Sequence, residues 1–536
     1  MRRRYFLFGS LAAGVGGCTS ISAVHGAGNR FTIPGTLRFS DGEDIGGLNL
    51  HIVPQVSVSQ LAQLTAAYLI RFDDAARPYP ELLQRIPSLA NGDISRDGLS
   101  ITYRLRPGLV WDDGHPLQAD DIAFSFAAVN NPRNNEYSRS GFDTVADVAV
   151  RDATTAVVKL KCKYGSFYEI FFSSQNIPLL PKHLLGDLPD INTAPYNALP
   201  AGSGPFKFTS WARNEAVEMV ANERYFRGRP KLDRIVYKIV PNWNTVETLL
   251  RTGELDMAWL VPSNITDRLA TSRGFKYLGQ PSDLRTQVQF NVSQPQLRDP
   301  VVRRALRLGI DRNALLHKIE HGHGYLSDSA LGPLCADAQQ IPPQPHDLKR
   351  AAAMLDAAGW TLGSDGVRAK DGMRLAIDLA TITGSPERDT WAVLIQSWWG
   401  ALGVKTSVKH YPPSVLFGAY SANGIFTRGN YSGGIDQQSY GYSGTLRSIF
   451  ACDQIPPAGF NQARICDAAL DGLLDRFDGS YDPAERKTTL AQIQRKIADD
   501  VPVITLFFPS DNYVYNADLR GLGTFANLDD AHRWSI

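Results

Sequence analysis

The chain has 536 residues, with 55 Lys and Arg against 54 Asp and Glu, and 43 % of its residues are hydrophobic. This length allows several domains and a substantial buried core. The near-zero net charge argues against a nucleic-acid partner held by a broad basic surface, and it implies no other class of partner.

The N-terminus, MRRRYFLFGSLAAGVGGCTS, has the layout of an export signal: a basic start, an apolar stretch over residues 5–15 and small residues up to Cys18. Arg3 to Leu7 resembles the twin-arginine export pattern, and Val15 to Cys18 resembles a bacterial lipobox, in which the cysteine carries a lipid. A cleaved signal with an incidental cysteine is the alternative. Residues 19–30 are small and polar, as in a tether. Both alternatives predict an extracytoplasmic protein in the periplasm or cell envelope.

The stretch LRPGLVWDDGHPLQADDIAFSFAAV, residues 105–129, contains two acidic pairs. Asp113-Gly114 is a turn signal, and apolar residues then recur from Ile122 at helical spacing. Asp120 and Asp121 therefore fall in the first turn of a helix, where negative charge complements the helix dipole. A turn followed by a helix start explains both pairs without catalysis.

The remainder of the chain alternates strand-like and helix-like segments, which predicts a mixed α/β fold. The predicted helices start at an Asp, with Pro next in two of them, and one ends at a Gly. The expected strands are 100–106, 156–162 and 204–211, and the expected helices are 299–308, 347–359 and 482–501.

Export makes disulfides permissible for the four cysteines that follow Cys18. Cys452 and Cys466 lie 14 residues apart, and a bridge there would remove about 3 kcal/mol of unfolded-state entropy. We therefore expect this pair to be bonded. The states of Cys162 and Cys335 stay open. No CxxC pair occurs, so the sequence gives no support to a zinc ribbon or a thioredoxin-type site.

A series of motifs in order along the chain resembles a known family. The motifs include Leu105-Arg106-Pro107-Gly108, Trp111-Asp112-Asp113-Gly114, Ala119-Asp120-Asp121, Gly202-Ser203-Gly204-Pro205-Phe206, Val302-Arg303-Arg304-Ala305-Leu306 and Ala357-Ala358-Gly359-Trp360. They resemble the extracytoplasmic solute-binding proteins of ABC importers, family 5, which includes dipeptide-, oligopeptide- and nickel-binding receptors. In that family the acidic stretch is a structural signature.

The resemblance implies an α/β, two-lobed periplasmic-binding-protein (Venus-flytrap) fold with an extra domain inserted in the first lobe. By analogy, residues 31–60, 196–285 and 505–536 form the first lobe, 61–195 the inserted domain and 286–504 the second lobe. Hinge crossings are expected near Gln289-Phe290-Asn291 and Leu506-Phe507-Phe508. The ligand would be enclosed between the lobes, and the closed form would be recognised by a membrane permease.

The resemblance also indicates where a peptide would bind. In peptide-binding relatives an Asp of the second lobe, ahead of a Cys pair, binds the peptide amine; here Asp436 is the equivalent residue. Tyr431, Tyr440 and Tyr442 could supply flat walls with polar tips. Arg388 is the candidate partner for the peptide carboxylate, with a surface residue at a helix start as the alternative. His51 lies where relatives often have a histidine near the cleft.

Two further interpretations compete with a peptide receptor. His317, His321 and His323 with Glu320 could clamp a metal, but Gly322 and Gly324 favour a solvated helix end, so no metal site and no cofactor are expected. A receptor for nickel or a metal chelate, an opine or an oligosaccharide also remains open. A secreted hydrolase is less favoured because no GxSxG or HExxH motif occurs. We expect a monomeric, non-enzymatic protein that delivers small peptides to an ABC permease.

Overall fold

The computed structural model describes residues 31–73, 76–136, 138–335, 337–441, 445–523 and 528–536. The export signal, the tether, Cys18 and Tyr442 lie outside the described residues. In the described part, no helix combines the length and the apolar character that a membrane crossing requires.

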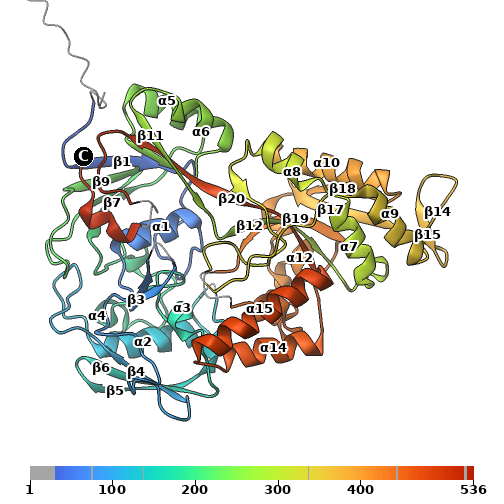
Figure 1. The fold of residues 1–536 in the computed structure, drawn as a ribbon. Coiled ribbons are helices and arrows are strands. Elements are labelled where there is room, and N and C mark those ends of the chain that lie inside the picture. Colours follow the sequence, from blue (N-terminus) through green and yellow to red (C-terminus); the bar gives the residue numbers. More distant parts are fainter. Residues whose placement is uncertain (1–30, 74–75, 137, 336, 442–444, 524–527) are drawn as a thin grey trace, which may run out of the picture.

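A single twisted sheet runs through both lobes of the molecule (Figure 1). The strands follow the order β18-β17-β19-β12-β20-β10-β1-β9-β8-β7, and β11 and β13 also pair with β20. In chain order the strands are β1 Thr36–Ser40, β7 Phe206–Ala212, β8 Ala216–Ala221, β9 Arg234–Lys238, β10 Met257–Trp259, β11 Phe275–Pro281, β12 Leu284–Phe290, β13 Gly324–Tyr325, β17 Ala376–Ile382, β18 Lys405–Tyr411, β19 Gly433–Ser439 and β20 Val503–Asn516.

Strand β20 is shared by the two lobes. Its first half, residues 503–507, pairs with β12, and its second half, residues 510–516, pairs with β11. The chain therefore passes between the lobes at residues 282–283, between β11 and β12, and again at residues 508–510 of β20. We call these two segments the hinge.

The expected first crossing near Gln289-Phe290-Asn291 was wrong. Gln289 and Phe290 lie inside β12, where Gln289 is paired with Gly434 of β19 on one side and Val503 of β20 on the other. Phe290 is fully buried in the core of the second lobe. The second crossing lies close to the expected Leu506-Phe507-Phe508. The ranges given above for the domains stay predictions.

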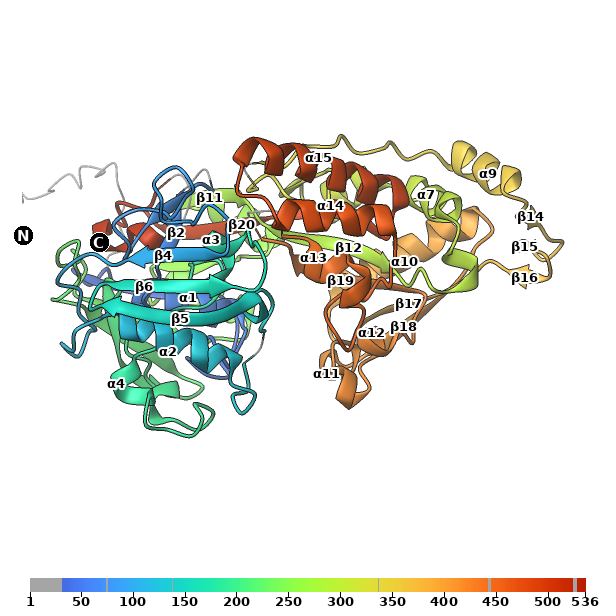
Figure 2. The same cartoon turned by 90° about the horizontal axis from the view of Figure 1, so that it is seen from below.

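Two smaller sheets lie between β1 and β7 in the chain, and a third lies in the second lobe. Figure 2 shows β4, β6 and β5 side by side, in the same half of the molecule as the strands of the first lobe. These strands are β2 Ile70–Phe72 with β3 Pro78–Pro80, then β4 Ser100–Arg104 with β5 Val145–Asp152 and β6 Thr155–Leu160, and finally β14 Thr361–Leu362, β15 Arg368–Lys370 and β16 Met373–Arg374.

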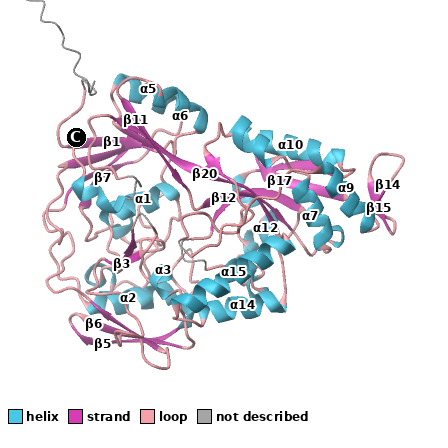
Figure 3. Ribbon diagram, viewed as in Figure 1, coloured by secondary structure: helices cyan, strands magenta, loops and turns pink. Residues whose placement is uncertain are grey.

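Helices pack around this band of strands (Figure 3). The longer ones are α1 Val56–Thr65, α2 Ala119–Asn130, α5 Trp243–Thr252, α6 Ser263–Ala270, α7 Pro300–Leu308, α9 Leu348–Ala357, α10 Pro386–Ala401, α14 Ala468–Asp478 and α15 Pro483–Asp500. The short ones are α3 Phe167–Ile170, α4 Lys182–Leu185, α8 Arg312–Ala314, α11 Pro413–Leu416, α12 Ile425–Arg428 and α13 Arg447–Phe450.

The helix starts follow the capping rules that the sequence indicated. The side chains of Asp299, Asp347 and Asp482 each accept a hydrogen bond from a backbone N–H in the first turn of α7, α9 and α15. Gly253 ends α5 with φ of 80°, a conformation that glycine adopts without steric cost. Local sequence thus fixes where these helices begin and end.

The acidic pair at the start of α2 has a structural role. The Asp121 carboxylate accepts hydrogen bonds from the backbone N–H of Gln118 (2.8 Å) and Lys182 (2.9 Å), and from the Trp111 indole (3.3 Å). Asp120 forms an exposed ion pair with Lys182 at 2.7 Å. Both carboxylates have partners, so this stretch caps a helix and joins it to α4.

Candidate functional site

A buried polar cluster lies on the neighbouring strands β12 and β19. Gln287 of β12 is directly opposite Asp436 of β19, so both side chains project from the same face of the sheet. The Gln287 Oε1 accepts hydrogen bonds from Arg285 and from the Tyr440 hydroxyl, the latter at 3.1 Å. The Arg285 guanidinium also stacks 4.0 Å from the centre of the Tyr440 ring. These contacts fix the side chains of Gln287, Arg285 and Tyr440 next to Asp436.

Asp436 is the buried acid of this cluster. The residue is 5 % exposed, and its Oδ1 has no hydrogen-bond partner among the described residues. Burial raises the pKa of its carboxyl to about 6, although a hydrogen bond from Gln287 and the charges of Arg388 and Arg285 oppose that shift. A buried carboxylate oxygen without a donor is costly, so Asp436 offers an open acceptor to a ligand.

Arg388 approaches the same cluster from the first turn of α10. Its Nη2 donates to the Gln437 side chain at 3.0 Å, whereas its Nη1 is buried without a partner in the described part of the chain. Burial lowers the pKa of Arg388, and Asp436 counteracts this effect. The structure thus brings Asp436 and Arg388 into one electrostatic environment, and each retains an unused polar atom.

The predicted tyrosines differ in their positions. Tyr440 belongs to the polar cluster, as described above. Tyr431 is buried against Phe426, with ring centres 4.8 Å apart, and its hydroxyl donates to the Gln462 carbonyl at 2.8 Å. The negative charge of Asp436 helps to raise the pKa of Tyr431, after burial as the main cause. Tyr431 therefore packs beside the cluster with its hydroxyl already in use.

His51 does not fit a ligand-binding role in this structure. The residue is fully buried; its Nδ1 pairs with the Glu136 carboxylate at 2.9 Å and its Nε2 with the Pro178 carbonyl at 2.9 Å. Both ring nitrogens are thus used within the first lobe and the segment between β1 and β7. His51 is a structural residue here, and the expectation of a cleft position is corrected.

The histidine-rich turn after α8 has contacts with the first lobe. His321 and His323 each pair with Asp267 of α6 at 2.8 Å, and Tyr277 of β11 donates to or accepts from His323 at 3.1 Å. The described residues contain no group of three His, Cys, Asp or Glu that could hold a metal ion. The turn therefore links the two lobes through Asp267.

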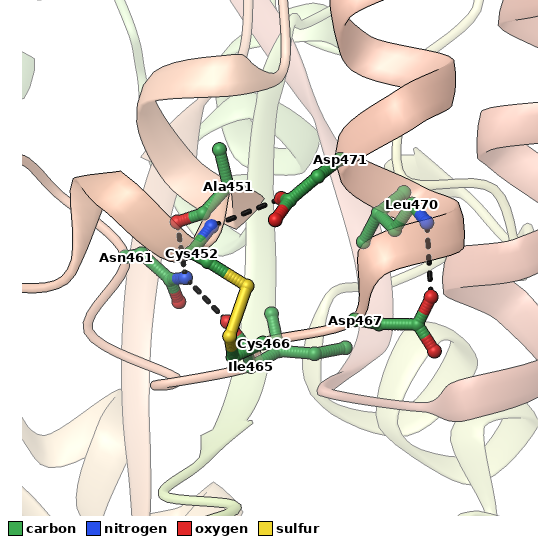
Figure 4. Close-up of a disulfide and its surroundings, with 8 residues drawn as sticks. All are labelled: Ala451, Cys452, Asn461, Ile465, Cys466, Asp467, Leu470 and Asp471. Atoms are coloured by element: carbon green, nitrogen blue, oxygen red, sulfur yellow. Dashed lines mark hydrogen bonds between the residues drawn. A yellow bond between two sulfur atoms is a disulfide. The ribbon is translucent and has the colours of Figure 1, made fainter.

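Cys452 and Cys466 form a disulfide, as their spacing predicts (Figure 4). Asn461 lies inside the loop and donates to the carbonyls of Ala451 (2.8 Å) and Ile465 (2.7 Å). Asp467, next to Cys466, caps α14 by accepting a hydrogen bond from the Leu470 N–H at 2.9 Å. The disulfide thus fixes the start of α14. Cys162 is an exposed free thiol, and Cys335 is a buried one.

The two lobes also touch away from the hinge, at what we call the closure contact. On the first-lobe side it comprises Gly98 and residues 164–166, and on the second-lobe side Asp478, Tyr481 and Arg486. The Tyr481 hydroxyl donates to the Gly98 carbonyl at 2.9 Å and accepts from the Tyr164 N–H at 3.2 Å. Ser166 Oγ accepts from Arg486 at 3.2 Å and lies 3.4 Å from Asp478 Oδ1. The lobes are therefore closed on one another.

Two cavities lie between the closed lobes. The larger, of about 850 Å³, is lined by residues 138–144 and 162–164 on one side and by the second lobe on the other, including residues 445–448 and 453–460. The smaller, of about 290 Å³, lies at the hinge and is lined by α1, β10, Ser282, Asp283, Ser439 and Asp511. We call it the hinge cavity. Ser439 is the last residue of β19, three residues beyond Asp436, so the hinge cavity lies at the end of the strand that carries the polar cluster, with the Ser439 side chain on the opposite face from Asp436.

Sequence reasoning missed the contribution of β12. In LRTQVQF the polar residues Arg285, Gln287 and Gln289 alternate with apolar ones, a period of two that indicates a strand with one polar face. That pattern could have identified Arg285 and Gln287. By contrast, no pattern relates Asp283 to Asp511, because only the pairing of β11 with β20 brings them together.

Comparison with known proteins connects this arrangement to a family. The model of bacterial extracellular solute-binding proteins, family 5, matches residues 84–446. Protein XP55 of Streptomyces lividans is 30 % identical over 443 residues, covering 81 % of this chain and 78 % of its own. The oligopeptide-binding protein AppA of Bacillus subtilis is 29 % identical over 441 residues, covering 79 % of this chain and 78 % of its own.

Solved structures show the same fold. The structure of AppA from Bacillus subtilis in complex with a nonapeptide superposes with a TM-score of 0.78 at 24 % identity, covering 94 % of this chain and 99 % of AppA. NikZ from Campylobacter jejuni in complex with Ni(L-His) also gives a TM-score of 0.78 at 24 % identity, covering 94 % of this chain and all of NikZ. At this identity the two structures establish the two-lobed α/β fold alone.

Proposed function

Because this chain belongs to the bacterial extracellular solute-binding proteins of family 5, we propose that it captures peptides between its lobes and delivers them to an ABC permease. Asp436 would bind the peptide ammonium group. The observation that carries this assignment is the buried Oδ1 of Asp436, which has no hydrogen-bond partner among the described residues.

The polar cluster supports recognition of a peptide backbone. The unpaired Nη1 of Arg388 can donate to a peptide carbonyl or carboxylate, and Gln437 and Gln438 of β19 are only partly buried. A guanidinium suits a carboxylate because it offers donors in a planar fork. The peptide would thus meet an acceptor at Asp436 and a donor at Arg388.

Closure of the lobes would be the transport signal. A ligand that contacts both lobes binds the closed form better than the open form, and a shift from 1:99 to 99:1 requires about 5.5 kcal/mol of differential affinity. The closure contact provides surfaces that meet only when the lobes are together. The permease would recognise this closed form. In this view the protein binds its ligand without catalysis and acts as a monomer outside the cytoplasm, with Cys18 as the site of a lipid anchor.

A second ligand class is favoured by one observation. NikZ, which shares the fold, binds Ni(L-His). A metal chelate with a free amine would also satisfy Asp436. Native mass spectrometry of the purified protein separates the classes: co-purified masses that fragment into amino acids support peptides, whereas a single metal-containing mass contradicts them.

The role of Asp436 is tested by calorimetric titration with the peptides so identified. The Asp436→Asn variant should lose at least ten-fold in affinity for a free-amine peptide, because a charge-assisted hydrogen bond is replaced by a neutral one. An N-acetylated version of the same peptide should bind the variant and the unmodified protein alike. Asp187→Asn, at an exposed aspartate, is the matched control. Unchanged binding of the free-amine peptide to Asp436→Asn would contradict the assignment.

A further inference from the structure

The hinge cavity has an unusual charge. Among the described residues, its charged lining residues are Asp73, Asp283 and Asp511, and none is Lys or Arg. Asp73 pairs with Arg77 at 2.7 Å, whereas Asp283 and Asp511 have no cationic partner in the described part of the chain. The Asp283 carboxylate accepts a hydrogen bond from Ser439, and Ser282 and Gln280 donate to Asp511. The described lining therefore presents two carboxylates without a cation.

The charge of Asp283 acts on Asp511. Asp283 lies in the turn between β11 and β12, and Asp511 lies opposite Gln280 in the β11–β20 pairing. Burial and the repulsion of Asp283 raise the pKa of Asp511 to about 7, and burial raises the pKa of Asp283 as well. Two carboxylates at close range resist ionisation together unless a positive charge joins them.

An aromatic wall completes the cavity. Trp259 is 3 % exposed and stacks on Tyr513, with ring centres 5.8 Å apart and 21° between the planes. The indole N–H of Trp259 has no hydrogen-bond partner among the described residues, although it is buried. Aromatic faces attract cations, and a buried unpaired donor requires an acceptor such as a peptide carbonyl.

The size and position of the cavity fit one side chain of a longer ligand. About 290 Å³ is at the low end of the range of about 300–1,000 Å³ found for whole small-molecule sites. Ser439, which lines the cavity, is the last residue of β19, about 10 Å along the strand from Asp436, and by strand alternation its side chain projects from the opposite face. A peptide whose amine is held at Asp436 would have to pass the end of β19 to place a long side chain in the cavity.

We propose that the hinge cavity binds the basic side chain of a bound peptide, an arginine or a lysine, between Asp283 and Asp511 and against Trp259. This inference rests on the peptide function proposed above and names a preference within it. The ligands would be peptides with a basic residue near the amino terminus.

Calorimetric titration of the full-length protein with two peptide series tests this preference. One series is penta-alanine with a single arginine at each position in turn, and the other has citrulline, which has the shape of arginine without its charge. At one position the arginine peptide should bind at least ten-fold more tightly than the citrulline peptide. The Asp283→Asn/Asp511→Asn double variant should reduce this ratio to less than two-fold and leave citrulline binding unchanged. Asp187→Asn should keep the ratio.

The outcomes separate this inference from the proposed function. Equal binding of arginine and citrulline peptides at every position overturns the basic-side-chain preference, while peptide binding itself stands. A ratio that persists in the double variant shows that the preference originates elsewhere and also overturns it. The arginine peptides are also tested in N-acetylated form. If the double substitution weakens binding of the free-amine peptides, and this weakening disappears on N-acetylation but persists with citrulline, the cavity binds the peptide ammonium group, which overturns the inference. If no peptide of either series binds, the proposed function fails and this inference with it. Circular dichroism and thermal melts establish that the variants are folded.

Discussion

Two aspartates between the lobes, Asp478 and Asp511, have opposite surroundings. At the closure contact, Asp478 lies beside Arg486 and Ser166, and burial still raises its pKa to about 6. In the hinge cavity, Asp511 lies beside another acid, and its pKa rises to about 7. One acid thus belongs to a contact that the protein completes by itself, whereas the other has no cation beside it among the described residues.

The largest effect is expected from Arg486→Ala at the closure contact. Arg486 donates to the Phe477 carbonyl at 2.8 Å and to Ser166, and its charge favours the ionised form of Asp478. Its removal leaves Asp478 buried without that cation, which should lower the free energy of unfolding by about 3–5 kcal/mol. Chemical denaturation measures this loss. Arg495→Ala, at an exposed position of the same helix, is the control, and equal losses in the two variants would contradict the role of Arg486.

Removing the disulfide should have the next largest effect on the free energy of unfolding. The effect should be confined to the side of the closure contact and should not reach the hinge cavity. The Cys452→Ser/Cys466→Ser variant frees a loop of 14 residues next to α14, whose last residue is Asp478. The free energy of unfolding should fall by about 3 kcal/mol. The arginine-to-citrulline ratio of peptide binding should stay the same. Cys162→Ser, at an exposed thiol, controls for the chemistry of the substitution. A change in that ratio would show that the two ends are not independent.

At the hinge cavity a substitution should increase the free energy of unfolding instead of lowering it. The pKa of Asp511 is about 7 in the folded protein against 3.8 for a free side chain, so its ionised form is disfavoured by folding. Asp511→Asn should therefore raise the free energy of unfolding of the ligand-free protein at pH 8, by about 1–2 kcal/mol. The gain should shrink as the pH falls through 7 and be nearly lost at pH 4, where the carboxyl is protonated in the folded protein and about half protonated in the unfolded chain. Denaturation curves of both proteins at pH 4, 6 and 8 measure it, and a loss of stability at pH 8 would contradict the comparison.

The smallest effect is expected from Tyr481→Phe, which removes one hydroxyl from the closure contact. That hydroxyl donates to Gly98 and accepts from the Tyr164 N–H, so the variant should lose about 1 kcal/mol of closure free energy. Small-angle scattering should then show a larger open fraction without ligand and the same closed form with it. An unchanged open fraction would show that the closure contact contributes little to the closed state.

Local elements could be predicted from the sequence because their causes are local. The capping aspartates at residues 299, 347 and 482 act within a single turn, and α7, α9 and α15 begin where they indicate. The same holds for the acidic pair of α2, which turned out to be structural. These features need no knowledge of the rest of the chain.

The interlobe features depend on long-range pairing, and there the sequence was less informative. The first hinge crossing that the family resemblance implied lies about seven residues too late, because only the pairing of β12 with β19 and β20 identifies residues 289–290 as part of a central strand. His51 looked available for a ligand, but Glu136, 85 residues away, uses its Nδ1. Asp283 and Asp511 meet across 228 residues of chain, and no local pattern relates them.

The central position of β20 also has a consequence for how the chain is built. Strand β20 follows all the other strands of the sheet in chain order, yet it lies between β12 of one lobe and β10 of the other. Neither half of the sheet can be completed before β20 has been synthesised, because both halves pair with it. Such non-local pairing is slow to form. Folding of the two lobes is therefore expected to finish together, once β20 is present, rather than one lobe at a time.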